Sequence, residues 1–189
     1  MDLSSADDRI LDEVLVLRAR AGHRDAFEAL AARWQERLWR YAFRLTGRED
    51  AAWDVLQESW MAIWRGLNRL RDPGAFRRWA FTIVTRAATD RLRQAPAEAA
   101  DADLFAAAAA RAAERGACDA DDRDSAVALV RAALAGLSRE HRALLSLHHL
   151  EGFAIWELAE ILGVPAGTVK SRLHAARGEL KERLKRMDR

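Results

Sequence analysis

The chain has 189 residues, with 31 lysines and arginines against 29 aspartates and glutamates, a formal net charge of +2 and hydrophobic residues at 50% of positions. This length allows one ordinary domain or two small ones, and the single cysteine, Cys118, excludes an internal disulfide and a cysteine-based structural zinc site, which favours a reducing, cytoplasmic setting. No run of about twenty apolar residues occurs, so we expect no membrane insertion, and the acidic start Met1–Asp12 lacks the apolar core of a signal peptide.

The first part of the chain has helical periodicity. Residues 10–47 form two apolar stretches with a break near 21–25, and a third helix is expected over Arg48–Leu67. On that helix one stripe is expected to be core: Trp53, Leu56, Trp60, Ile63, Trp64 and Leu67. Trp64→Ala should then cost about 3–5 kcal/mol. A second side carries three polar residues at i, i+3 and i+4, Asp54, Gln57 and Glu58, for which a solvated surface is the simplest explanation.

Arginines alternate with aromatic residues in the next segment. After a loop at Asp72–Gly74 comes the run Phe76–Thr82, and further arginines follow up to Arg93. Aromatic faces can stack on unpaired bases while guanidinium groups hold the phosphate backbone, so this composition suits single-stranded nucleic acid. Some of the aromatic residues are expected to be structural, with the arginines as the nucleic-acid contacts.

The middle of the chain is acidic and rich in alanine. Between Gln94 and Ser125 there are eight acidic residues against three arginines, whereas Pro165–Arg189 has eight lysines and arginines against three acids. We interpret 94–124 as a flexible linker that can be transiently helical. The near-neutral total therefore hides a basic end of the kind that meets phosphate.

The last part predicts a helix-turn-helix. Ser138 is placed to cap a helix over Arg139–Leu150, a short helix follows over Ile155–Leu162, and Gly163 suits the turn into a third helix. Val169 and Leu173, at i and i+4, form the buried stripe of that last helix. Its other faces carry side chains able to meet phosphates or base edges in a major groove: Thr168, Lys170, Ser171, Arg172, His174 and Arg177.

One simpler explanation remains open for this part: the basic face can be the solvated surface of a generic three-helix unit. His148 and His149 suggest a metal site, but neighbours on a helix point about 100 degrees apart, so they do not chelate one ion together and are expected to be solvated or partly buried.

Three segments resemble a known family. Asp54–Arg65 resembles the core-polymerase-binding helix of bacterial sigma factors, Phe76–Arg93 resembles their promoter-melting helix, and Gly163–His174 is very similar to their minus-35 recognition helix. The resemblance covers residues 25–93 and 127–185. The absence of an intermediate domain is the layout of the extracytoplasmic-function (ECF) group of the sigma-70 family.

The resemblance implies roles for these residues. Asp54, Gln57 and Glu58 would bind the clamp helices of the polymerase β′ subunit, the linker would thread polymerase channels, and part of the C-terminal domain would meet the β flap. The unpaired minus-10 strand would be held by Asn68, Arg69, Arg71, Phe76, Arg77, Arg78, Trp79, Thr82 and Arg86. Thr168, Lys170, Ser171, Arg172, His174 and Arg177 would contact minus-35 DNA. An anti-sigma factor is a further partner that the resemblance allows.

Three positions depart from the family pattern. Trp53 stands where an acidic residue is common, and Arg86 stands where the family often has Asn, which leaves open the base read near it. Ala154 stands where Ser usually caps a helix, a loss of about 1 kcal/mol.

We therefore expect an all-α protein of two small helical domains joined by an acidic flexible linker. The expected divisions are an N-terminal tail and the start of the first helix over 1–24, the polymerase-binding and melting domain over 25–93, the linker over 94–126, and the helix-turn-helix domain over 127–189. We expect a transcription initiation factor that is no enzyme and has no cofactor. The alternatives are a stand-alone helix-turn-helix regulator and a helical interaction module that binds no DNA.

Overall fold

The computed structural model describes residues 3–94, 129–130 and 132–187, and within these residues the regular structure is helical. Four long helices come first: α1 (Leu3–Arg20), α2 (Arg24–Thr46), α3 (Glu49–Gly66) and α4 (Phe76–Gln94), with short 3-10 turns η1 (Leu67–Arg69) and η2 (Pro73–Ala75) between the last two. The expected linker falls almost entirely outside the described residues. The all-α prediction is confirmed.

The C-terminal helices follow the predicted pattern with one difference. They are α7 (Arg139–Leu145), the π-helical segment η4 (Ser146–Leu150), α8 (Ile155–Leu162) and α9 (Ala166–Met187). Ser138 caps α7 as predicted, because its hydroxyl accepts a bond from the amide of His141 at 3.3 Å. Gly163 ends α8 in the left-handed conformation, with φ at 67°, which turns the chain into α9. The expected helix over 139–150 is found at the expected place, but it changes from α-helical to π-helical at Ser146.

α2 is the central helix of the N-terminal half. It packs against α1, α3 and α4, and Leu30, Leu38 and Tyr41 on its inner side are fully buried. Its end is set by Gly47, whose φ of 74° lets its amide bond to the carbonyl of Phe43 at 2.8 Å. The first helix lies ahead of the expected domain start at residue 25, yet Leu15, Val16 and Ala19 bury it against the rest.

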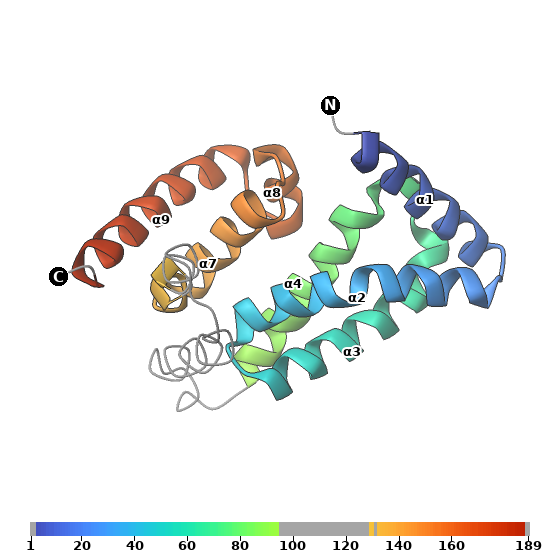
Figure 1. The fold of residues 1–189 in the computed structure, drawn as a ribbon, viewed down its shortest axis with the longest axis horizontal. Helices are drawn as coiled ribbons and strands as arrows, with labels where there is room; N and C mark the ends of the chain where they lie inside the picture. Colours follow the sequence, from blue (N-terminus) through green and yellow to red (C-terminus); the bar gives the residue numbers. More distant parts are fainter. Residues whose placement is uncertain (1–2, 95–128, 131, 188–189) are drawn as a thin grey trace, which may run out of the picture.

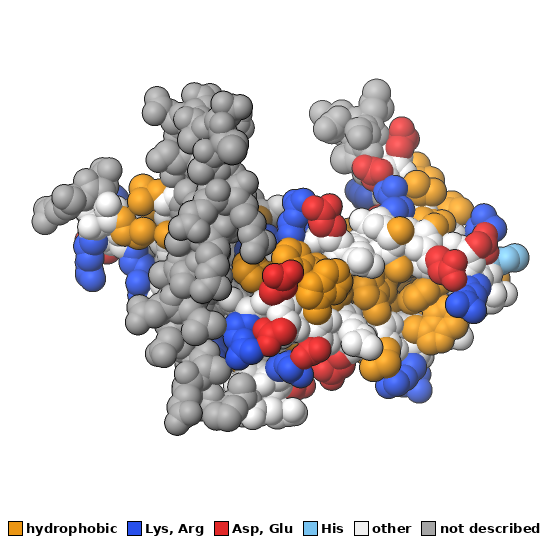
Figure 2. Space-filling view, turned by 60° about the horizontal axis from the view of Figure 1, so that its bottom comes forward, with side chains coloured by type: hydrophobic (Ala, Val, Ile, Leu, Met, Phe, Trp, Pro, Cys, Tyr) orange, Lys and Arg blue, Asp and Glu red, His pale blue; other side chains and the backbone are white. Residues whose placement is uncertain are grey.

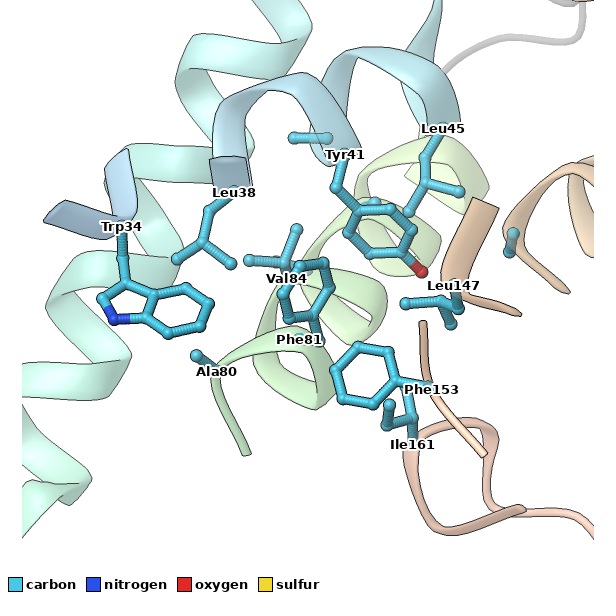
Figure 3. Packing of buried hydrophobic residues seen from close by; sticks show 14 of the residues in the cluster. Trp34, Leu38, Tyr41, Leu45, Ala80, Phe81, Val84, Leu147, Phe153 and Ile161 are labelled. Carbon is cyan, nitrogen blue, oxygen red and sulfur yellow. The ribbon is translucent and has the colours of Figure 1, made fainter. Parts of the chain in front are cut away.

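The two halves are in contact. In Figure 1, α1–α4 lie on the right and α7–α9 on the left, and α4 packs against α8 while α2 packs against α7. Phe81 of α4 and Phe153, just before α8, meet with ring centroids 5.2 Å apart, and both are buried. Figure 3 shows these rings between side chains of α2 and of the C-terminal half, so one core runs through both units.

The tryptophan stripe expected on α3 is wrong in part. Leu56, Ile63 and Leu67 are buried as predicted, but Trp53 is 46% and Trp64 51% exposed. The strip of α3 that faces its neighbours is narrow and includes Ser59, whose hydroxyl donates to the carbonyl of Val55 at 2.6 Å. The wide indole rings stand at the edges of this strip and lie against aromatic residues of α2, since Trp64 contacts Phe27 at 4.6 Å and Trp53 contacts Trp39 at 5.7 Å between centroids.

Candidate nucleic-acid and protein interfaces

The solvent face of α3 carries the first candidate site. Asp54, Gln57 and Glu58 are all exposed and lie within two turns of the helix. Asp54 forms an ion pair with Arg91 of α4, and both side chains are about half exposed, at 48% and 46%. An exposed pair of this kind contributes at most about 1 kcal/mol to folding. The three polar residues are therefore brought together on a surface that is available to a partner.

Apolar side chains flank this acidic face. Trp53, Met61 and Trp64 are each close to half exposed. Trp53 leans on Trp39, which itself stacks on Phe43 with the ring planes 15° apart. Figure 2 shows hydrophobic side chains lying among charged ones on this side of the molecule. Large exposed aromatic residues beside charges are typical of protein-binding surfaces.

The loop between α3 and α4 presents the first candidate nucleic-acid contacts. Asn68, Arg69 and Arg71 are exposed. The Asp72 carboxylate accepts a bond from the amide of Gly74 at 3.0 Å, which starts the turn η2. α1 packs behind η1 and η2, so the loop is supported from one side and its arginines are open to solvent.

The aromatic residues at the start of α4 are mostly structural. Phe76 is 1% exposed, and its ring contacts Trp34 at 5.8 Å between centroids. Trp79 is half-buried and lies so close to Gly66 that a Cβ there would come within 2.9 Å of the indole. The Phe76 ring is therefore not available to stack on a base, contrary to the role expected for it among the DNA contacts.

The arginines of α4 divide into two groups. Arg86 is exposed, whereas Arg77 and Arg78 are directed to the C-terminal half. The guanidinium carbon of Arg77 lies 4.1 Å from the ring centroid of Phe153, and burial lowers the pKa of Arg77. Arg78 lies over the ring of Trp156 at 5.1 Å, and its Nε is 2.7 Å from a carboxylate oxygen of Glu160. The last of the α4 candidates, Thr82, donates its hydroxyl to the carbonyl of Arg78 at 2.9 Å.

The helix-turn-helix geometry has the predicted division of faces. Val169 and Leu173 are buried at 0% and 2% exposure, and they fix the back of α9 against α7 and α8. The candidates on the other faces lie outward: Lys170, Ser171, His174 and Arg177 are exposed, while Thr168 and Arg172 are half-buried.

Two of these α9 side chains have neighbours that hold them. Nη1 of Arg172 is 3.2 Å from a carboxylate oxygen of Glu140 on α7, and Nε of Arg177 donates to the ring of His149 at 3.4 Å. The ion pair with Glu140 thus holds the Arg172 side chain against the first turn of α7 when no DNA is bound. His149 has a lowered pKa, first because it is partly buried and then because His148 and Arg177 lie beside it.

The start of α8 lacks half of the usual cap. Glu157 accepts a bond from the amide of Ala154 at 2.8 Å, but the alanine side chain has no oxygen to accept a bond in return. The side-chain cap that the sequence predicts to be missing at Ala154 is therefore also missing in the structure.

Sequence reasoning missed a group of charged residues between the two halves. Glu151 is 6% exposed, and its two carboxylate oxygens accept bonds of 2.6 Å from Nε of Arg37 and Nη2 of Arg44, both on α2. Arg142 of α7 is 5% exposed and donates to the carbonyls of Leu137 and Arg44. From the sequence, Glu151 and Gly152 were interpretable only as a helix end, because the partners of Glu151 lie more than a hundred positions earlier in the chain.

Among the described residues no helix is long and apolar enough to cross a membrane. Within the same residues, no group of three or more His, Cys, Asp or Glu side chains is placed to hold a metal ion.

Comparisons with protein families match both halves. Residues 30–97 match the model for Sigma-70 region 2, and residues 128–180 match the model for Sigma-70, region 4. Among curated proteins, the chain is 38% identical over 164 residues to the ECF RNA polymerase sigma factor SigM of Mycobacterium tuberculosis, which covers 85% of this chain and 78% of that protein. It is 30% identical to the RNA polymerase sigma-H factor of Pseudomonas aeruginosa, with coverage of 88% and 90%.

Two solved structures with the same fold are complexes with a second protein. CnrH in complex with the cytosolic domain of CnrY superposes with a TM-score of 0.67 at 27% identity, covering 93% of this chain and 97% of that one. RpoE in complex with the anti-sigma factor NepR, from Bartonella quintana, superposes with a TM-score of 0.63 at 23% identity, covering 84% and 96%. The second likeness concerns the fold alone.

Proposed function

Because the chain belongs to the extracytoplasmic-function group of the sigma-70 family, and so binds core RNA polymerase and directs it to promoters, we propose how its surfaces divide that work. The match of both halves to sigma regions carries the family assignment. A stand-alone helix-turn-helix regulator would leave the region 2 match over 30–97 without a role, and a module that binds no DNA would leave the region 4 match without one.

We propose that the acidic face of α3 binds the β′ clamp helices. Asp54, Gln57 and Glu58 are exposed side by side and take no part in the core. Charges placed on an exposed helix face steer association and set register with a basic partner. Trp53, Met61 and Trp64 at the edges of this face supply the apolar contact area that charged residues lack.

We propose that promoter DNA is contacted at two places. The α3–α4 loop and α4 hold the unpaired minus-10 strand, through Asn68, Arg69, Arg71, Arg77, Arg78, Trp79, Thr82 and Arg86. α9 lies in the minus-35 major groove and makes its contacts through Thr168, Lys170, Ser171, Arg172, His174 and Arg177. The domain limits of 25–93 and 127–189 and the threading of the linker through the polymerase belong to the same proposal.

In this proposal the polymerase makes the RNA, and the protein itself carries out no covalent chemistry. The protein works in the bacterial cytoplasm, where the polymerase is.

CnrH and RpoE are bound to CnrY and NepR in their structures. By this likeness we propose an anti-sigma factor as the protein that holds this chain inactive, and the β flap as the polymerase element that α7–α9 contact.

Co-purification tests the polymerase part of the proposal. Tagged protein should retain core polymerase on a column, and the complex should protect both a minus-10 and a minus-35 element of one promoter in a footprint. A protein that retains no core polymerase but footprints DNA alone would be a stand-alone regulator. A protein that does neither would be an interaction module.

A further inference from the structure

The first helix, α1, has apolar residues on two opposite sides. One side is buried against the rest of the N-terminal half through Leu15, Val16 and Ala19. In Figure 1, α1 lies at the edge of the molecule. Its outer side carries four large aliphatic side chains whose exposed fractions lie between 43% and 59%: Ile10, Leu11, Val14 and Leu17. Neighbouring apolar side chains that stay exposed are typical of a surface that binds another protein.

Three of these residues have the spacing of a coiled-coil seam. Ile10, Val14 and Leu17 are separated by four and then by three positions, so they form one stripe along the helix with a mean spacing of about 3.5 residues. Side chains with this spacing fit between those of a second helix that has the same pattern. The outer side of α1 therefore has the pattern of a surface that binds another helix.

The charged residues beside this stripe are complementary to a second copy of α1. Glu13 and Arg20 lie on the same edge of the stripe, at the positions that flank a seam. When two copies run antiparallel with Val14 of one against Leu17 of the other, Glu13 of each copy lies beside Arg20 of the other. The arrangement is two-fold symmetric, so it forms two ion pairs at once.

The same charges favour the antiparallel over the parallel orientation. In a parallel pair Asp7, the next residue along the stripe, would face its own copy, and the like charges would repel. Glu13 would then face Arg18, whose Nη2 already donates to the Asp25 carboxylate at 3.0 Å. Arg20, by contrast, forms no ion pair within the described part of the chain. The antiparallel pair therefore uses an arginine that is still available.

We propose that the protein self-associates through α1, as an antiparallel pair in which the stripe of Ile10, Val14 and Leu17 covers the same stripe of a second copy. The contact spans about three helical turns. This is at the small end of specific interfaces, so we expect a weak dimer with a dissociation constant of about 10–100 µM. No residue of this face is among those proposed to contact polymerase or DNA, so the inference goes beyond the proposed function and does not depend on it.

The first measurement is the molecular mass of the full chain as a function of concentration, by analytical ultracentrifugation. The mass should rise from that of one chain toward that of two. The test variant is Ile10→Gln/Leu17→Gln, in which glutamine keeps the helix propensity and removes apolar surface from both copies. We expect its dissociation constant to be at least about tenfold higher than that of wild type.

The matched control is Leu150→Gln/Met187→Gln, which replaces two exposed apolar side chains of the C-terminal half. It should associate like wild type. A wild-type protein that stays monomeric at about 1 mM would overturn the proposal. So would a control that weakens the dimer as much as the test variant does.

The second measurement tests the ion pairs and the orientation. Glu13→Arg and Arg20→Glu each place like charges together along the seam, and we expect each variant alone to associate about tenfold more weakly than wild type. An equal mixture of the two variants should associate at least as tightly as wild type, because opposite charges face one another in every mixed pair. This rescue also shows that both variants are folded.

Two results would overturn the antiparallel pair. One is a mixture that associates no better than the separate variants. The other is an Arg20→Glu variant that associates like wild type, because Arg20 lies beside Glu13 of the second copy only in the antiparallel orientation.

Discussion

Asp54 and Glu58 stand on the solvent face of α3, and their charges serve no buried contact. We expect Asp54→Lys/Glu58→Lys to weaken binding to core polymerase by tenfold or more, because charge reversal turns attraction into repulsion at the interface. The melting temperature should hardly change, since the surface pair with Arg91 contributes at most about 1 kcal/mol. Reversal at Glu28 and Glu36, two exposed acids of α2, is the control. Normal retention of polymerase by the α3 variant in a pull-down would contradict the assignment.

Ile63 and Trp64 are adjacent in the chain, but Ile63 lies in the core and Trp64 at the surface. Trp64 is 51% exposed and contacts chiefly Phe27, so Trp64→Ala should cost about 1 kcal/mol, the size of one aromatic pair. Ile63 is fully buried, and Ile63→Ala should cost about 2–5 kcal/mol. Urea unfolding of both variants measures the difference. Equal losses of free energy would mean that the Trp64 side chain is part of the core.

Residue patterns predicted the buried positions well where a helix has one clear partner. Val169 and Leu173 on α9 are examples. The same kind of pattern failed on α3, because periodicity identifies the side of a helix on which apolar residues gather but not the width of the neighbouring surface that covers that side. Trp53 and Trp64 lie at the edges of that surface.

At the scale of helices, α8 offers a direct test of capping. Ala154 has the extended backbone of an N-cap residue, with φ at −70° and ψ at 160°, but no side-chain acceptor. Ala154→Ser adds a hydroxyl that can accept a bond from the Glu157 amide and complete the capping box. We expect a gain of about 1 kcal/mol in the free energy of unfolding. An unchanged or lower melting temperature would show that the loop before α8 does not leave room for the hydroxyl.

α9 and α4 are expected to act on different forms of DNA. Arg172→Ala should weaken closed-complex formation on duplex promoter DNA, because α9 presents this side chain on a groove-reading face. Arg77→Ala/Arg78→Ala should spare duplex binding in the presence of polymerase and reduce strand opening detected by permanganate. A template with a pre-melted bubble should rescue the second variant and not the first. The same defect on both templates would remove the distinction between the two surfaces.

The break between α1 and α2, the extent of α3 and the helix-turn-helix could be predicted from the sequence, since caps and turn glycines such as Ser138 and Gly163 act locally. The π-helical turn at Ser146–Leu150 could not, because nothing in its local composition departs from an α-helix. Asp54, Gln57 and Glu58 on α3 are exposed as the sequence pattern indicates, whereas Arg77 and Arg78 of α4 face the C-terminal half. The buried position of Phe76 was not predicted, since an aromatic residue at the start of a helix gives the same pattern whether it points inward or outward.

At the scale of the whole molecule, the sequence predicted two units and a linker but not their contact. The residues that join the units, Glu151 with Arg37 and Arg44, are far apart in the chain and belong to no motif. Each looks like an ordinary surface charge on its own helix. Long-range pairs of this kind become visible only when the units are placed in space, which is why the engagement of Arg77 and Arg78 was not expected.

Transcription reconstituted from core polymerase, this protein and DNA from upstream of its own gene tests the central claim most directly. We predict a run-off transcript with one start site that depends on the protein, is lost with Asp54→Lys/Glu58→Lys, and is reduced by Arg172→Ala. The same transcripts with core polymerase alone, or undiminished initiation by the α3 variant, would contradict the account.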